Sequence, residues 1–429
     1  MSLFQNLSST FFLEYLEFIN LDQWTCNNIQ LEGIIMDGLK SRPQKKKLSR
    51  NLLQMKSQFR VIPQESLLSN PTCPHGPTIL FQRVHSSAPE QFFACSAFRD
   101  PKECRQNQVH SKDIVPWNGK DLPLLYCHTC SSLDSASSTS HSNHEYVSPV
   151  DITLPSTFLK PLDDDKAQAQ YHFQTQSAEF ILNCVSSAKD TAVLCIGAPT
   201  IHEKLKIQGV KSIMLDIDHR YASFYPMLQY NMFNHYFFNK SDEEVYKEFL
   251  RDNKKCSLSI VMDPPFGGKV ELLSATLTSI EKDWNHSKNK PRIFWIFPYF
   301  MENNIIEACG DLRMMGVPIE YNNHAKYSRR KQGSPVRLFT NISLKKIPLK
   351  GKLKKLYRKC NICQVVTCGM HCDLCGQCPS KNGGSYSHCS ICKRCVKDSW
   401  SHCMQCNRCA LPDHPCDLFI RNKKRKLND

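Results

Sequence analysis

The sequence predicts an α/β protein in which residues 165–345 form a parallel sheet flanked by small zinc-binding modules. Short apolar stretches alternate there with amphipathic ones, which is the pattern of strands and helices in a parallel sheet. Cysteines and histidines at metal-ligand spacing gather on both sides of this region. With 429 residues, the chain is also long enough to bury a large core and to hold more than one domain.

The first two predicted strands end in residues typical of a nucleotide-binding site. Residues 192–197 form an apolar run that ends at Gly197, and residues 210–218 form a second run that ends in Asp216 and Asp218. Gly197 and Asp216 lie 19 residues apart. In a Rossmann-like fold, a turn at the first position approaches the cofactor, and an acid about 20 residues later binds ribose hydroxyls. We assign ribose binding to Asp216, with Asp218 as the alternative.

A later apolar run, residues 258–262, ends abruptly in Asp263-Pro264-Pro265-Phe266 and two glycines. Methyltransferases that modify an exocyclic amino group carry this kind of sequence at the end of a central strand. The lone pair of adenine N6 is delocalised into the ring, so the site must accept the amine protons and hold the ring face. Asp263 and the Pro264 carbonyl supply acceptors, and Phe266 supplies a stacking surface. A polar turn that only caps a core strand is the alternative.

Together these features follow the order of a class I, Rossmann-like methyltransferase domain that uses S-adenosyl-L-methionine. The turn at 197–200 lacks the full Gly-x-Gly-x-x-Gly sequence of dinucleotide-binding proteins. S-adenosylmethionine has no pyrophosphate, so this departure weakens a dinucleotide site and leaves a methyl-donor site intact. Further apolar runs at 292–297 and 336–342 supply later strands of the domain at 165–345.

Two four-ligand sets precede the predicted sheet, and four nitrogen or sulfur ligands are what a closed tetrahedral zinc site requires. Residues 71–108 resemble the GRF-type zinc finger, a small three-stranded module associated with single-stranded nucleic acid. Residues 125–148 have nearly Cys2His2 spacing around a serine-rich spacer. Scattered thiols and incidental histidines are the alternatives. The predicted ligands are Cys73, His75, Cys95, Cys104, Cys127, Cys130, His141 and His144.

Residues 358–418 form a cysteine and histidine array with an internal repeat, His-Cys-x2-Cys-x2-Cys. We expect the first and last ligands of each repeat to bind different metal ions in a staggered ladder. Few apolar residues separate the ligands, so we expect this segment to be unfolded without metal. With the two earlier sets, the ligands suffice for about six Zn2+ ions. The array's ligands are Cys360, Cys363, His371, Cys372, Cys375, Cys378, His388, Cys389, Cys392, Cys395, His402, Cys403, Cys406, Cys409, His414 and Cys416.

Composition restricts the partners and the compartment. The net charge of +15 favours an anionic partner, nucleic acid before a membrane surface. No run approaches the roughly 18 apolar residues of a membrane span. We also expect no secretory signal. Because disulfides form mainly in exported proteins, we expect the 23 cysteines to be metal ligands more often than disulfide partners. Residues 1–70 have no assignment. The basic tract 42–50 and the basic tail 419–429 are typical of nuclear-import or RNA-contacting segments, and plain solvated tails are the equal alternative.

The order of parts from about 73 to 416 resembles the CCHC-domain zinc-finger methyltransferases that form N6-methyladenosine in large-subunit (28S-type) ribosomal RNA. The stretches that carry this resemblance lie at 73–78, 127–130, 169–173, 215–221, 230–235, 263–268, 294–300 and 334–342. The Cys-x2-Cys-x4-His-x4-Cys knuckle of that family does not occur in the 429 residues. By this resemblance, S-adenosylmethionine contacts would fall on Gln170, Tyr171, His172, Phe173, Thr200, Asp216, Asn231, Met232 and Asp263.

The resemblance implies an enzyme that methylates a structured ribosomal RNA with an accessible adenosine and supports ribosome biogenesis and translation. It also implies RNA helicase or ribosome-assembly partners. The expected location is the nucleus, nucleolus and cytoplasm, and the resemblance leaves the oligomeric state open. One alternative is the same chemistry on DNA adenine or a protein amide. Another is a zinc-dependent RNA-binding scaffold with an inactive methyltransferase domain. Residues 413–416 are similar to the Asp-His-His-Cys sequence of palmitoyltransferases, but Pro415 interrupts it and no membrane span accompanies it.

Overall fold

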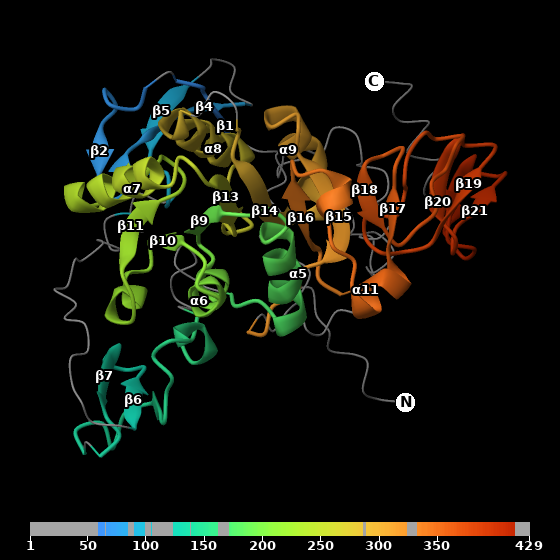
Figure 1. The fold of residues 1–429 in the computed structure, drawn as a ribbon. Coiled ribbons are helices and arrows are strands. Elements are labelled where there is room, and N and C mark those ends of the chain that lie inside the picture. Colours follow the sequence, from blue (N-terminus) through green and yellow to red (C-terminus); the bar gives the residue numbers. More distant parts are fainter. Residues whose placement is uncertain are drawn as a thin grey trace. The chain divides into compact units, whose positions relative to one another are not determined.

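The structure is a computed structural model, and the chain divides into two compact units that are described separately (Figure 1). One unit is residues 59–348, and the second includes residues 349–416. Gln170, the tract 42–50 and the predicted tail 419–429 lie outside the described residues. The structure describes residues 59–64, 66–84, 90–98, 104, 123–137, 139–161, 171–285, 289–323 and 333–416.

An eight-stranded sheet forms the centre of unit 59–348, in the order β12-β11-β10-β9-β13-β14-β16-β15. Five neighbouring strands are parallel: β11 (Met227–Asn231), β10 (Ser212–Asp216), β9 (Thr191–Ile196), β13 (Ser257–Met262) and β14 (Arg292–Pro298). The other three are β12 (Tyr236–Phe237), β16 (Val336–Thr340) and β15 (Arg313–Pro318). The predicted α/β fold with a large sheet is confirmed.

The sheet is mixed, which differs from the wholly parallel sheet that the sequence predicts. β12 runs antiparallel to β11, and β16 runs antiparallel to both of its neighbours, β14 and β15. The register pairs Arg313 with Thr340 and Met314 with Phe339, so β15 and β16 run in opposite directions. An apolar run such as 336–342 predicts a buried strand but does not report its direction.

Helices precede, connect and follow the strands of the central sheet. They are α5 (Thr175–Val185), α6 (Pro199–Ile207), α7 (Lys240–Asp252), α8 (Val270–Trp284) and α9 (Glu302–Ala308), with short 3-10 helices η1 (Pro155–Thr157), η2 (His219–Ser223), η3 (Tyr299–Met301) and η4 (Leu344–Lys346). Helices cover the sheet, and residues 192–196 of β9 are fully buried. This burial explains why that strand has a continuous apolar sequence instead of an alternating one. No described helix is long and apolar enough to span a membrane.

Two small β modules pack in the same unit, and each holds one of the predicted ligand sets. The first zinc module, described residues 59–104, contains a three-stranded sheet and a short hairpin: β1 (Phe59–Val61), β4 (Ile79–Arg83) and β5 (Gln91–Ala94), then β2 (Thr72–Cys73) and β3 (Gly76–Pro77). The second zinc module, described residues 123–161, contains β6 (Leu124–Cys127), β7 (Ser132–Ser135) and β8 (Tyr146–Val147). Strand β1 comes from residues to which the sequence assigns no structure.

The described part of the second unit, which we call the zinc array (residues 349–416), consists of one short helix and three hairpins. The elements are α11 (Gly351–Leu356), β17 (Arg358–Cys360) with β18 (Val365–Thr367), β19 (Tyr386–Cys389) with β20 (Arg394–Lys397), and β21 (Ser401–Cys403) with β22 (Arg408–Ala410). Among its described apolar residues other than cysteine, only Val366 and Val396 are buried. The array therefore has almost no hydrophobic core of its own.

Candidate functional site

The carboxyl ends of β9, β10 and β13 bring three predicted site residues to one edge of the sheet. These strands are parallel neighbours, and Gly197, Asp216 and Asp263 end or directly follow them. Gly197 has φ +64°, and a Cβ there would lie 2.9 Å from the Asp263 carbonyl oxygen and 3.0 Å from Cε of Met232. A side chain at position 197 would therefore collide with the residues beside it, so the turn requires glycine. Ligands of open α/β sheets bind at such an edge.

Asp263 is held by a residue that the sequence analysis does not identify. The Tyr321 hydroxyl donates a hydrogen bond to Oδ1 of Asp263 at 2.8 Å, and Tyr321 itself is buried. Burial raises the pKa of Asp263 well above its ordinary value; the Tyr321 hydrogen bond opposes this rise, and the charge of Asp216 adds to it. Tyr321 lies 58 residues after Asp263 with no fixed spacing, so only the folded structure reveals the pair.

Aromatic rings cluster around Tyr321, the partner of this carboxylate. Phe173 stacks on Tyr321 with ring centroids 5.1 Å apart, and Phe266 meets Tyr321 edge-on at 6.0 Å. Tyr171 lies at 6.3 Å from the same ring. Backbone pairing fixes the arrangement, because Phe173 forms a bridge with Tyr321 and Asn322 N–H donates to the His172 carbonyl at 2.8 Å. Two predicted cofactor residues, Tyr171 and Phe173, and the predicted stacking residue Phe266 thus share one aromatic cluster.

His172 is part of the protein interior. It is buried, and its Nε2 lies 2.9 Å from the Tyr221 hydroxyl, within hydrogen-bond distance. Burial, with a smaller contribution from the charge of Arg220, lowers the pKa of His172 to about 4. The side chain is therefore neutral at physiological pH and supports the segment that carries Tyr171 and Phe173.

Thr200 and Asp216 are placed at the same edge. Thr200 lies in the first turn of α6, and its buried hydroxyl has no hydrogen-bond partner among the described residues. A buried hydroxyl without a partner is costly, and a polar ligand at the glycine turn would relieve that cost. Asp216 is buried, and its carboxylate accepts the backbone N–H of Asp218 at 2.9 Å.

The alternative acid, Asp218, is engaged elsewhere. Its carboxylate forms a forked ion pair with the Arg220 guanidinium, with Nη2 to Oδ2 at 2.7 Å and Nε to Oδ1 at 3.0 Å. Arg220 also donates from Nη1 to the Lys160 carbonyl of the second zinc module at 3.0 Å. Asp218 therefore joins the sheet to that module, and the ribose assignment to Asp216 is favoured.

Asn231 ends β11 and Met232 follows it beside the glycine turn, but their side chains face different neighbours. The Asn231 amide donates from Nδ2 to the His75 carbonyl and to Ser96 Oγ, both at 2.8 Å. Both amide protons are thereby committed to the first zinc module, and Oδ1 accepts the Phe233 backbone N–H at 3.0 Å, so the side chain of Asn231 has no free donor for a cofactor. Met232 is buried and points toward Gly197, as the distance above shows.

The ligand sets of the two zinc modules have the spacing of tetrahedral metal sites. Within each set, the donor atoms all lie within 4.8 Å of one another. Zinc bonds of about 2.0–2.3 Å place tetrahedral ligands roughly 3.3–3.8 Å apart, and Cys104 Sγ lies 3.6 Å from His75 Nδ1. Hydrogen bonding with the Cys95 thiol, against the opposing effect of burial and with smaller contributions from His75 and Cys104, lowers the pKa of Cys73 to about 4, as expected for a crowded thiolate site. These residues fit zinc.

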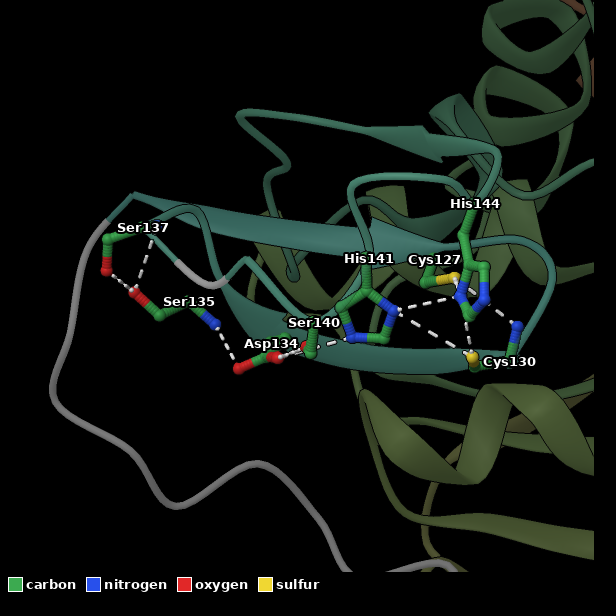
Figure 2. Close-up of polar contacts among 8 residues, drawn as sticks. All are labelled: Cys127, Cys130, Asp134, Ser135, Ser137, Ser140, His141 and His144. Carbon is green, nitrogen blue, oxygen red and sulfur yellow. Dashed lines mark hydrogen bonds and ion pairs between the residues drawn. The ribbon is translucent and has the colours of Figure 1, made fainter.

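The second zinc module also has an outer carboxylate. Figure 2 shows Cys127, Cys130, His141 and His144 converging, with His144 Nδ1 at 3.3 Å from Cys130 Sγ. On the far side of its ring, His141 Nε2 lies 3.2 Å from Oδ2 of Asp134. A carboxylate that accepts the second ring N–H fixes the orientation of a metal-binding histidine. Asp134 has that position, and ligand spacing alone does not identify it.

The zinc array corrects our expectation for the repeats. The first and last ligands of a repeat lie in the same group, and the inner two cysteines lie in the next one. His388 pairs directly with Cys395 across the β19–β20 hairpin, and Cys389, its neighbour in the strand, faces the other way. The groups are Cys360/Cys363/His371/Cys378, Cys372/Cys375/His388/Cys395 and Cys389/Cys392/His402/Cys409.

The remaining four predicted ligands of the array also meet. Cys403 Sγ lies 3.3 Å from Cys416 Sγ, and His414 Nε2 lies 3.2 Å from Cys406 Sγ and 3.0 Å from Cys416 Sγ. The staggered ladder is thus present, with alternation of strand faces deciding which ligands share a metal. Which faces meet is fixed only by the folded structure, so the ligand spacing in the sequence leaves this pairing open.

Residues 164–344 match the family model described as probable N6-adenine methyltransferase. A glycine turn, a strand-end acid and Asp263 at one edge of an α/β sheet agree with this match. The chain is therefore a methyltransferase of the N6-adenine class, and methyltransferases of this class take their methyl group from S-adenosylmethionine.

Curated relatives define the family more closely. The chain is 38% identical over 414 residues to the human rRNA N(6)-adenosine-methyltransferase ZCCHC4, covering 83% of this chain and 80% of the relative. It is 37% identical to the Mus musculus protein of that name over 358 residues (70% of each chain) and 37% identical to the Xenopus laevis protein over 362 residues (72% and 73%). The chain belongs to this rRNA N6-adenosine-methyltransferase family, which confirms the predicted resemblance.

Proposed function

We propose that this chain methylates N6 of an adenosine in large-subunit (28S-type) ribosomal RNA, with the base held by Asp263-Pro264-Pro265-Phe266. The observation that carries the proposal is Asp263 directly after β13, hydrogen-bonded by Tyr321, whose ring contacts Phe173 and Phe266. The names of the relatives support ribosomal RNA as the substrate. A DNA or protein substrate would use the same residues, and no named relative favours it.

The sheet supports a class I, Rossmann-like domain. Taking β9 as the first strand, the neighbours on one side are the next two strands in sequence, and on the other side the order continues β13, β14, β16, β15. The strand order reverses between β9 and β13, and ligands of such sheets bind at this point. Gly197 follows β9 and Asp263 follows β13, so the proposed cofactor and base sites lie at the reversal.

The cofactor site is proposed to use Tyr171, Phe173, Thr200, Asp216 and Met232. Asp216 would bind ribose hydroxyls, and the rings and Met232 would provide apolar walls. The hydroxyl of Thr200 would gain the partner that it lacks. When bound, S-adenosylmethionine supplies an electrophilic methyl group on a sulfonium.

In the proposed mechanism, the chain's own residues orient the amine and accept its proton. Asp263 and the Pro264 carbonyl accept hydrogen bonds from N6, and Phe266 stacks on the base. Positioning supplies most of the acceleration. The raised pKa of Asp263 makes this carboxylate a better acceptor for the proton that N6 loses. Tyr321 keeps Oδ1 in place while that proton moves.

The zinc modules and the basic surface are proposed to bind the RNA and to set which adenosine arrives. About six zinc ions would fill the described ligand groups. Structured RNA is recognised mainly through phosphates, and a splayed base enters the enzyme pocket. This substrate implies a role in ribosome biogenesis and translation. It also implies a place in the nucleus, nucleolus and cytoplasm, with RNA helicase or ribosome-assembly partners.

Methyl transfer by the purified chain tests the proposal. Wild type should transfer label from S-adenosylmethionine to ribosomal RNA, and Asp263→Ala should lower the rate by about 100-fold or more. Asp252→Ala, at the exposed end of α7, is the matched control and should transfer at the wild-type rate. Equal rates for wild type and Asp263→Ala would refute the mechanism. Adding DNA or protein as a competitor for methylation tests whether RNA is the preferred substrate. Calorimetry tests binding of S-adenosylmethionine, and no detectable binding would favour the RNA-binding scaffold with an inactive domain.

A further inference from the structure

The turn between β11 and β12, residues 231–236, contacts two parts of the molecule that are far apart in the sequence. Asn231 ends β11 and pairs with Tyr236 in β12, so the chain reverses through four residues. On one side lies the first zinc module, and on the other lies the catalytic turn, residues 263–268. This turn is therefore the physical connection between a metal site and the base-binding residues.

Two amides of the turn bind one carbonyl of the first zinc module. Asn231 Nδ2 donates to the His75 carbonyl at 2.8 Å, and Asn234 Nδ2 donates to the same oxygen at 3.0 Å. Asn234 also donates to the Pro77 carbonyl at 2.9 Å. His75 is a member of the metal-ligand group and is fully buried, so metal binding at its ring restrains the carbonyl that both amides need.

A third contact leaves no space between the turn and the module. Gly76 has φ +95°, and a Cβ there would lie 2.4 Å from the Tyr236 ring. Lys269, directly after the catalytic turn, donates from Nζ to the Phe59 carbonyl at 3.3 Å. The module is thus seated on β12 and on the start of α8 at the same time.

The other side of the turn supports the catalytic residues. A Cβ at Gly268 would lie 2.7 Å from Cε1 of Phe233, so the ring packs directly on that glycine. The same ring packs in a small apolar cluster with Ile79 and Phe81 of the zinc module and Leu272 of α8. Gly268 N–H donates to the Pro265 carbonyl at 2.8 Å, which closes the catalytic turn. Phe233 therefore touches both the module and the turn that it would position.

His235 holds the turn in its conformation. Its φ is +52°, a left-handed value that few residues other than glycine adopt. His235 Nε2 lies 2.9 Å from Asp283 Oδ2, and its Nδ1 lies 2.6 Å from the Tyr230 hydroxyl. These contacts fix the residue between Asn234 and Tyr236, so the turn is stiff enough to transmit a displacement.

We propose that Asn234 and Phe233 are positioning residues through which the metal-filled first zinc module sets the geometry of the catalytic turn 263–268. Loss of metal frees the His75 carbonyl, loosens the Asn234 amide and lets the Phe233 ring move from Gly268. The zinc module then contributes to the methyl-transfer step itself and not only to RNA binding. This inference rests on the proposed function for its kinetic readout alone.

Hydrogen exchange and kinetics on the full zinc-loaded chain test the coupling. Asn234→Ala should keep its zinc content, measured by atomic emission, while the amides of 263–268 exchange faster. Its kcat for RNA methylation should fall by about tenfold to a hundredfold with the RNA KM almost unchanged, since a displacement of about 1 Å costs up to that much. Phe233→Ala should behave alike, and Phe233→Leu, which keeps an apolar contact, should recover most of the rate.

Asn303→Ala, an exposed residue of α9, is the matched control and should show wild-type exchange and kcat. Asn234→Asp keeps the shape without the donor protons and carries the same test if the alanine variant folds poorly. Wild-type exchange and kcat in the Asn234 variants would overturn the inference. The exchange experiment needs no RNA, so it decides the coupling even if the wild-type chain fails to methylate ribosomal RNA.

Discussion

The two units of this chain are stabilised by different physics. In unit 59–348, the strands of the sheet bury continuous apolar runs, and side chains as large as Trp295 and Phe297 are fully buried. In the described zinc array, Leu374 is 78% exposed and Met404 is also 78% exposed. Hydrophobic burial can therefore hold the catalytic unit together, while the array depends on metal–ligand bonds. The first zinc module combines both, because its apolar cluster includes a residue of α8.

Zinc removal should produce the largest difference in stability between the two units. Structural zinc contributes about 10–16 kcal/mol in small metal-binding modules, and the array has little else to hold it. With a strong chelator, amide protection in 349–416 should disappear while the strands of the central sheet keep theirs. Hydrogen exchange with mass spectrometry reads both regions in one sample. If the amides of the β19–β20 hairpin stay protected without metal, the array does not depend on its metal–ligand bonds.

The pH dependence of the zinc array and the contribution of Glu203 in unit 59–348 should have opposite signs. Acid protonates thiolate ligands and releases zinc from the array. In unit 59–348, burial raises the pKa of Glu203 to about 7 from 4.5, although hydrogen bonds from Ser156 oppose the rise. The folded state then binds more protons than the unfolded state between these values, so the unfolding free energy falls as pH rises from about 4.5 to about 7.

The rise in the pKa of Glu203 corresponds to a change of about 3 kcal/mol in the unfolding free energy. Glu203→Gln should remove that loss, giving similar unfolding free energies at the two ends of this pH range. Urea unfolding of both proteins, followed by tryptophan fluorescence, measures the difference. In the described array every acidic side chain is exposed, so no comparable effect should arise there. Equal pH slopes for wild type and Glu203→Gln would show that Glu203 is not the cause.

Tyr321→Phe should have the smallest effect and should be confined to the catalytic edge. The Tyr321 hydrogen bond lowers the pKa of Asp263 against the rise caused by burial, so its loss should raise that pKa further. The acidic limb of the kcat profile should move to higher pH, and the rate should fall by about tenfold, as for one lost hydrogen bond to a charged group. Zinc content should be unchanged. An unchanged pH profile would exclude this role for Tyr321.

The sequence predicts those features that depend on local periodicity or fixed spacing. Apolar runs locate the strands that end at Gly197, Asp216 and Asp263, and ligand spacing locates the zinc groups. Features that depend on distant contacts escape it. Tyr321 reaches Asp263 from 58 residues away. Asn231, predicted as a cofactor contact, has its amide protons committed to the first zinc module because that module docks on β12. Strand direction and the pairing of ligands also depend on which faces meet.

The identity of the methylated product tests the central claim most directly. Large-subunit ribosomal RNA from cells lacking this gene, incubated with the purified zinc-loaded chain and labelled S-adenosylmethionine, is digested to nucleosides and analysed by mass spectrometry. The account predicts label in N6-methyladenosine at a defined RNA position, with none for Asp263→Ala. Label in another nucleoside, or none in RNA although the chain binds the cofactor, would contradict it.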